Sequence, residues 1–119
     1  MEKILFLIND APYGTEKMFN ALRLAINLQR EHKENVDIRV FLMGDAVTGT
    51  ITDQELPSGY YNIEKMLNSV IRNGGKVKAC GTCAQARGID ELNLIDGVEI
   101  STMSQLSQWT VEADKVFTF

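Results

Sequence analysis

The chain has 119 residues, 45% of them hydrophobic and 24% charged. This length is typical of one domain, so we expect a single domain over residues 1–119. The 12 Lys and Arg residues and 16 Asp and Glu residues give a formal net charge of −4. That balance argues against a nucleic-acid partner, because such an interface needs a basic face.

Nothing in the sequence indicates a membrane protein. No apolar stretch reaches the roughly 20 residues of a membrane-spanning helix, so we expect no membrane partner. The apolar run Ile4–Ile8 resembles part of a signal peptide, but Asn9 and Asp10 interrupt it and no small-residue cleavage site follows. We therefore expect a cytoplasmic protein.

The first half of the chain predicts two strands and a helix. The continuous apolar run Ile4–Ile8 is typical of a parallel strand that is covered on both faces. After a turn-rich segment, Thr15 is expected to cap a helix that runs to about Glu31. A polar connection then leads to a second strand over Val36–Met43.

Residues 45–60 show weak periodicity and predict a long loop. Loops of this length are usually lids, binding loops or oligomer contacts, although a loop without function is the alternative. A second helix is predicted next, because apolar residues recur at i, i+3, i+4, i+7 and i+8. These residues are Ile63, Met66, Leu67, Val70 and Ile71, and the segment Asn73–Gly75 ends the helix.

The second half of the chain continues the alternation of strands and helices. We expect a strand over 76–80, a short helix over 83–86, a strand over 98–101, a helix opened by the capping box Thr102–Gln105, and a strand over 115–119. Lys76 and Lys78 are unusual in a central strand, so their side chains either extend outward or mark one open face. The alternation predicts an α/β fold with a five-stranded parallel sheet and helices on both faces.

In such a sheet, ligands bind beyond the carboxyl ends of the strands. Three strand ends carry notable residues, namely Asn9 and Asp10, Gly44 and Asp45, and Cys80. The chain has no Gly-rich phosphate loop and no Ser-His-Asp set, so a nucleotide site and a serine hydrolase have little support.

The two cysteines, Cys80 and Cys83, are the most informative residues. They are too few for a disulfide scaffold, and with His32 in a distant segment they cannot supply the four ligands of a structural zinc site, so no metal is expected. Cys80 ends a strand just before a helix, where backbone N–H groups and the helix dipole favour the thiolate. Lys78 and Arg87 could add positive charge, while burial as two small core residues remains the alternative.

Three segments together resemble the DsrE/DsrF-like family and are closest to its small YchN-type members. These segments are NDAPYG at 9–14, VFLMGDA at 40–46 and KACGTCAQARG at 78–88, and the resemblance covers the whole chain. It implies a three-layer α/β/α sandwich with a five-stranded parallel sheet, assembled into trimers or hexamers. It also implies sulfur relay, with sulfur held as a persulfide on the cysteine that matches Cys80 ahead of Arg87-Gly88, without any cofactor. Cys83 has no equivalent in the sulfur-relay members.

The leading hypothesis is therefore a sulfur carrier, similar to a sulfurtransferase, that exchanges sulfur with donor and acceptor proteins. One alternative is a thiol–disulfide or persulfide-reducing module in which Cys83 resolves an intermediate on Cys80. The other alternative is a non-catalytic oligomeric scaffold or small-ligand binder. The sequence therefore leaves open whether the protein is an enzyme. A broad apolar stripe on the first helix (Ala21, Leu24, Leu28) and the pair Tyr60-Tyr61 favour a homo-oligomer.

Several residues are expected to line the substrate pocket around the two catalytic cysteines: Asn9, Asp10, Tyr13, Gly44, Asp45, Gly81, Thr82 and Arg87. The backbone N–H groups of Gly81–Cys83 are expected to hold the persulfide anion. Asn9 and Tyr13 are expected to approach Cys80 as further donors, while the Asp10 carboxylate turns away. A carboxylate of Asp10 or Asp45 close to the sulfur would instead raise the thiol pKa.

Overall fold

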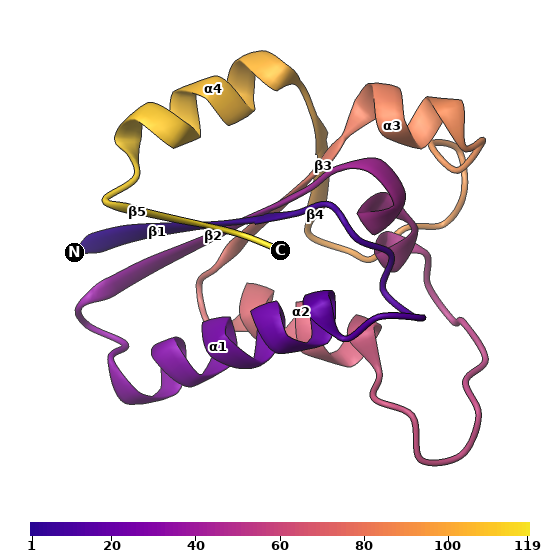
Figure 1. Cartoon of the computed structure of the whole chain (residues 1–119), viewed down its shortest axis with the longest axis horizontal. Coiled ribbons are helices and arrows are strands. Elements are labelled where there is room, and N and C mark those ends of the chain that lie inside the picture. Colours follow the sequence, from indigo (N-terminus) through magenta and orange to yellow (C-terminus); the bar gives the residue numbers. More distant parts are fainter.

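The computed structural model describes residues 1–119 as a parallel sheet with helices on both faces (Figure 1). The elements in chain order are β1 (Glu2–Ile8), α1 (Lys17–Glu31), β2 (Val36–Leu42), the 3₁₀ helix η1 (Gly44–Thr50), α2 (Ile63–Arg72), β3 (Lys76–Cys80), α3 (Gly81–Ala86), β4 (Val98–Ser101), α4 (Met103–Glu112) and β5 (Lys115–Thr118). All neighbouring strands pair in parallel, in the order β4-β3-β2-β1-β5. This arrangement confirms the predicted three-layer α/β/α fold with five parallel strands. None of the helices combines the length and the apolar character needed to cross a membrane.

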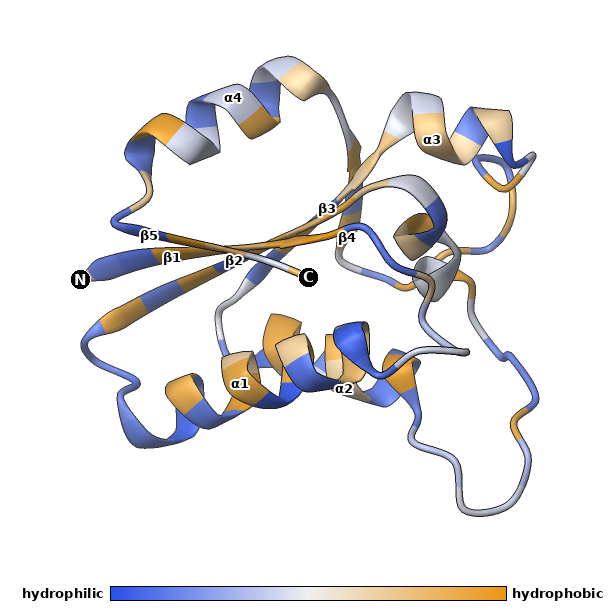
Figure 2. Cartoon of the chain, viewed as in Figure 1, coloured by the Kyte–Doolittle hydropathy of each residue, from blue (hydrophilic) through white to orange (hydrophobic).

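Much of the core lies on both faces of the neighbouring strands β1 and β2. Leu5 and Phe6 of β1 and Val40 and Phe41 of β2 are almost fully buried. Figure 2 shows that β1 is hydrophobic along most of its length. A strand covered on both faces needs apolar side chains at successive positions, and the apolar runs Ile4–Ile8 of β1 and Val40–Leu42 of β2 meet this need.

The start of the first helix differs from the prediction. The helix begins at Lys17, and Glu16 precedes it without a capping hydrogen bond from its side chain. The Thr15 hydroxyl accepts a hydrogen bond from the Lys17 N–H at 3.4 Å, so Thr15 lies one position too early to be the cap. The predicted N-cap was therefore wrong by one residue.

The prediction of a loop over residues 45–60 was wrong for residues 45–50. Residues 44–50 form η1, in which Ala46, Val47 and Thr50 are buried. Tertiary contacts stabilise this short helix, since the Thr50 carbonyl accepts a hydrogen bond from the Ile95 N–H at 2.8 Å. Such a contact between distant segments leaves no periodic signal in the local sequence.

The helix α4 covers the part of the sheet where Lys78 emerges. The Lys78 ammonium lies 4.9 Å from the centre of the Trp109 ring and donates to the Gln105 side chain at 3.0 Å. Thr102 caps α4 by accepting a hydrogen bond from the Gln105 N–H. Lys78 is therefore accommodated under α4, and only Lys76 of the two strand lysines is exposed.

Candidate active site

Cys80 lies where β3 passes directly into α3. It is the last residue of the strand, where it pairs with Ser101 of β4, and it is also the N-cap of the helix. Only 7% of its surface is exposed. The junction needs no loop, so the thiol is held by regular backbone on both sides.

The first turn of α3 supplies hydrogen bonds to the Cys80 sulfur. The Cys83 N–H donates to Cys80 Sγ at 3.3 Å, and the Thr82 hydroxyl lies 3.3 Å from the same atom. Burial raises the pKa of Cys80, but hydrogen bonds from the side chains and backbone of Cys83 and Thr82 outweigh it and lower the pKa below its ordinary value. The thiolate, which is the nucleophilic form, is thereby favoured.

Cys83 behaves in the opposite way. Burial and the hydrogen bond that its thiol makes with Cys80 raise the pKa of Cys83, while the Gly44 backbone and Arg87 act against this shift. Both cysteines are free thiols in this structure. The pair therefore consists of an acidic thiol, Cys80, and a neighbouring thiol that retains its proton.

A hollow of about 620 Å³ opens beside Cys80 on the face that carries α3 and α4. Its lining comes from the end of β2, from β3 and α3, from Asp90, and from the junction of β4 with α4; the residues are Met43, Cys80, Gly81, Thr82, Cys83, Gln85, Asp90, Ile100, Ser101, Thr102 and Met103. A Cβ atom at Gly81 would lie 3.1 Å from the Ser101 carbonyl oxygen, so a larger residue there would push β4 away from α3.

Of the other residues predicted for the site, Gly44, Asp45 and Arg87 lie close to Cys83. The Asp45 carboxylate accepts a hydrogen bond from Arg87 Nε at 2.9 Å, and Arg87 also donates to the Cys83 carbonyl at 3.1 Å. Asp45 thus faces a compensating cation. Through these two hydrogen bonds the Arg87 side chain connects α3 with η1, and it does not line the hollow.

The expectation that Asn9 and Tyr13 approach Cys80 was wrong. In the sheet order, β2 separates β1 from β3, so the end of β1 lies two strands away from the thiol. The Tyr13 hydroxyl accepts a hydrogen bond from the Ile63 N–H, and its ring stacks with Tyr61. None of Asn9, Asp10 and Tyr13 lines the hollow.

The Asp10 carboxylate makes its contacts in the segment that connects β1 with α1 and at the first residue of α1. It accepts a hydrogen bond from the Thr15 hydroxyl at 3.4 Å and lies 3.6 Å from the Lys17 ammonium. Asp10 makes no contact that would disfavour the Cys80 thiolate.

The residues that sequence reasoning missed come mostly from the junction of β4 and α4. Ser101 pairs with Cys80 across the sheet, and Thr102 and Met103 follow it into the wall of the hollow. The capping box at Thr102 was a usable signal, because it places a helix start at the same edge of the sheet as Cys80. Asp90 and Gln85 carried no comparable signal.

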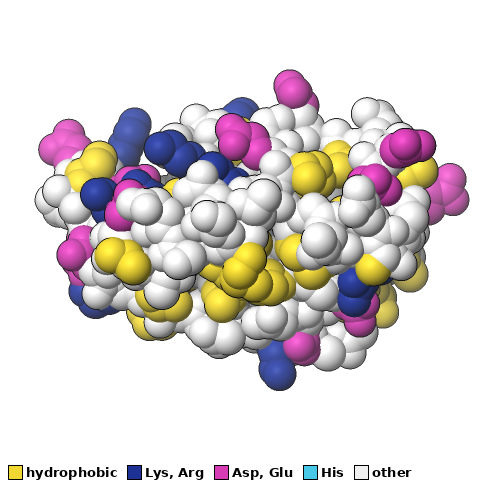
Figure 3. All heavy atoms as spheres, turned by 90° about the horizontal axis from the view of Figure 1, so that it is seen from above, with side chains coloured by type: hydrophobic (Ala, Val, Ile, Leu, Met, Phe, Trp, Pro, Cys, Tyr) yellow, Lys and Arg dark blue, Asp and Glu magenta, His cyan; other side chains and the backbone are white.

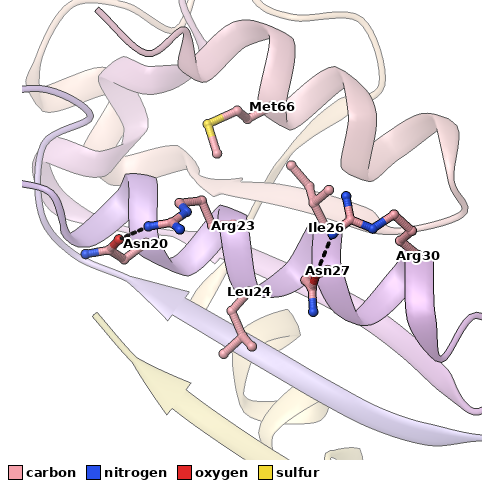
Figure 4. Close-up of a pocket in the computed structure, with 7 residues that line it drawn as sticks. All are labelled: Asn20, Arg23, Leu24, Ile26, Asn27, Arg30 and Met66. Carbon is pink, nitrogen blue, oxygen red and sulfur yellow. Dashed lines mark hydrogen bonds between the residues drawn. The ribbon is translucent and has the colours of Figure 1, made fainter.

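A second hollow, of about 460 Å³, lies along α1 and reaches Met66 of α2 (Figure 4). Arg23 and Arg30 line it, and each is hydrogen-bonded to an asparagine three residues earlier on α1. No thiol or carboxylate lines this hollow, so it offers no nucleophile or general base.

The DsrE/DsrF-like family model matches residues 2–119. The chain belongs to this family. It is 53% identical to Protein YchN of Escherichia coli K12 over 119 residues, which is all of both chains, and 38% identical to protein MK0008 of Methanopyrus kandleri over all of this chain and 95% of that one. The crystal structure of E. coli YchN superposes with a TM-score of 0.93 at 52% identity over the full length of both chains. Protein MTH1491 of Methanobacterium thermoautotrophicum, at 19% identity and a TM-score of 0.74 over both full chains, shares the fold.

The lowered pKa of Cys80 and the raised pKa of Cys83 predict two separate alkylation profiles. The alkylation rate of Cys80 should reach half of its maximum at a lower pH than that of a free cysteine, because its lowered pKa lets the thiolate form earlier as the pH rises. Cys83 should react only at higher pH. Iodoacetamide kinetics followed by peptide mass spectrometry measure both rates. A Cys80 midpoint at or above that of a free cysteine would contradict the prediction.

Proposed function

We propose that this protein is a sulfur carrier that holds sulfane sulfur as a persulfide on Cys80. The supporting observation is the position of Cys80, whose sulfur accepts hydrogen bonds from the first turn of α3 while facing a hollow at the carboxyl edge of the sheet. The DsrE/DsrF-like family to which the chain belongs is associated with sulfur relay. The thiolate form that these hydrogen bonds favour is the one that attacks sulfur.

In the loading step, the Cys80 thiolate attacks the outer sulfur of a donor persulfide, R–S–SH. The new S–S bond forms at Cys80 while the donor's S–S bond breaks, and the donor leaves as the thiolate R–S⁻. An acceptor protein then takes the outer sulfur by the same exchange. The reaction needs no metal and no organic cofactor, and we place it in the cytoplasm, where thiols stay reduced.

Inorganic polysulfide, followed by mass spectrometry of the intact protein and of its peptides, tests this proposal. We expect a gain of about 32 Da, corresponding to one added sulfur, on the peptide that contains Cys80. Dithiothreitol should remove the added mass. A protein whose mass does not change under conditions that load a free cysteine would overturn the proposal.

The position of Cys83 in the first turn of α3 supports persulfide reduction as a second candidate function. The Cys83 N–H donates to Cys80 Sγ at 3.3 Å, so the two cysteines are neighbours at the start of the helix, and the Cys83 thiol is available to attack the inner sulfur of a Cys80 persulfide. That attack would form the Cys80–Cys83 disulfide and release hydrogen sulfide, and an external dithiol would then regenerate both thiols. A loss of about 2 Da relative to the reduced protein, with sulfide released, would favour this function over the carrier.

We also propose that the protein is a homo-oligomer, a trimer or a hexamer. The outer edge of β5 is unpaired, and the exposed apolar side chains of Val116, Phe117 and Leu24 lie there and on the adjoining part of α1. Light scattering at micromolar concentration should return three or six times the chain mass of 13.3 kDa.

Phe117→Asp should lower this mass, because it places a charge among the exposed apolar side chains of β5 and α1. Val111→Asp, at an exposed position of α4, should leave the mass unchanged. Scattering from the unaltered protein at the mass of one chain would contradict the assembly.

A further inference from the structure

The hollow beside Cys80 has apolar walls that are exposed to solvent. Ile100 and Met103 line it and are 47% and 61% exposed, and Met43 in the same lining is half-buried. Figure 3 shows this face of the molecule, with a group of hydrophobic side chains near its middle. Exposed apolar walls around a nucleophile favour a ligand with an apolar group, and methionine side chains adapt to ligands of different shape.

The charge of the hollow is negative. Asp90 is the one Asp, Glu, Lys or Arg residue in its lining, and it forms no ion pair. Arg87 at the end of α3 and Lys78 of β3 do not line the hollow and are already paired, Arg87 with Asp45 at 2.9 Å and Lys78 with Glu99 at 3.5 Å. Together with the Cys80 thiolate, Asp90 therefore disfavours a negatively charged ligand.

The dimensions of the hollow suit a small molecule. Its volume of about 620 Å³ lies within the range of roughly 300–1,000 Å³ that is typical of small-molecule sites. Cys80 is only 7% exposed, so a reacting partner has to enter the hollow to reach the sulfur. A small thiol compound can do so without any rearrangement of the protein.

We infer that the sulfur donor is a low-molecular-weight organic persulfide whose organic group is apolar and carries no negative charge. This inference rests on the proposed carrier function and puts a small molecule in place of the donor protein that the family resemblance implies. The Cys80 thiolate attacks the outer sulfur of the protonated donor, and the donor's thiolate leaves the hollow. The apolar walls bind the organic group, while Asp90 and the thiolate favour the neutral form of the donor.

Methanethiosulfonate reagents test the pocket without any sulfane sulfur. Each reagent, R–S–SO₂CH₃, forms a Cys80–S–S–R disulfide and releases methanesulfinate, so the leaving group is the same for every R group. For each reagent, the rate of Cys80 modification is measured in the Cys83→Ser variant. It is then divided by the rate at which the same reagent modifies a small uncharged thiol compound. We expect the butyl reagent to exceed the methyl reagent, and the trimethylammonioethyl reagent to exceed the sulfonatoethyl reagent by roughly fivefold at low salt.

Matched variants show which residues cause the preferences for the butyl group and for positive charge. Asp90→Asn should reduce the charge preference, whereas Glu91→Gln, at the neighbouring exposed carboxylate outside the hollow, should leave it intact. Met103→Gln should reduce the preference for butyl over methyl, and as an exposed side chain it can be replaced without loss of the fold. Equal effects of the Asp90 and Glu91 variants would overturn the role of Asp90.

The same series separates failure of this inference from failure of the carrier function. Equal normalised rates for the butyl and methyl reagents, or a faster sulfonatoethyl reagent, would overturn the inference and leave a protein donor, even where Cys80 accepts sulfur from polysulfide. If the protein shows both selectivities but polysulfide does not load it, the ligand preference of the hollow is supported and the carrier function is overturned.

Discussion

Replacing Cys80 by serine is expected to abolish sulfur loading from polysulfide, whereas Cys83→Ser is expected to retain it. Serine cannot form a persulfide, so Cys80→Ser removes the sulfur that the proposal requires. Its hydroxyl can still accept the Cys83 N–H that caps α3, and the fold should therefore persist. Cys83→Ser keeps this backbone donor and removes only the second thiol.

Mass spectrometry after polysulfide treatment, with circular dichroism to confirm folding, measures the difference between these variants. Sulfide release should fall in Cys83→Ser wherever release from the unaltered protein passes through the Cys80–Cys83 disulfide. Loss of loading in Cys83→Ser together with loading in folded Cys80→Ser would reverse the roles of the two thiols.

Most of the fold was predictable because the strands and α-helices carry local signals, which η1 lacks. The buried strand β1 reads as a continuous apolar run, and α2 reads as apolar residues at helical spacing. The end of α2 at Asn73 followed by glycines, and the start of α4 at the Thr102 capping box, are also local. These signals need no knowledge of distant contacts, which is why the predicted order of strands and α-helices matched the structure.

The position of Cys80 at the β3–α3 junction was equally predictable, since a strand pattern ends there and a short helix follows. The neighbours of Cys80 were harder to predict, because they depend on strand order. Parallel pairing places β2 beside β3 on one side and β4 on the other, which removes Tyr13 from the site and brings Ser101 into it. Residue types at strand ends do not encode that order.

The second large effect is expected at Trp109, which holds α4 on the sheet. Trp109 and Leu106 are the only buried residues of this helix. The Trp109 ring meets Phe41 edge-on at 6.2 Å, and the Arg39 guanidinium lies 5.4 Å from its centre. Lys78 contacts the same ring, so Trp109→Ala removes apolar packing and also leaves two cations without their aromatic partner.

We therefore expect Trp109→Ala to lower the free energy of unfolding by about 3–5 kcal/mol, the usual cost of truncating a buried aromatic residue to alanine. Urea denaturation measures this loss, and Val111→Ala, at an 82% exposed position of the same helix, is the matched control with little change. Because α4 carries Met103 in the wall of the hollow, its loosening should also expose Cys80 and raise its alkylation rate. Equal stability of the Trp109 and Val111 variants would show that other contacts hold α4 on the sheet. An unchanged alkylation rate of Cys80 in a destabilised Trp109 variant would show that the packing of α4 does not control access to Cys80.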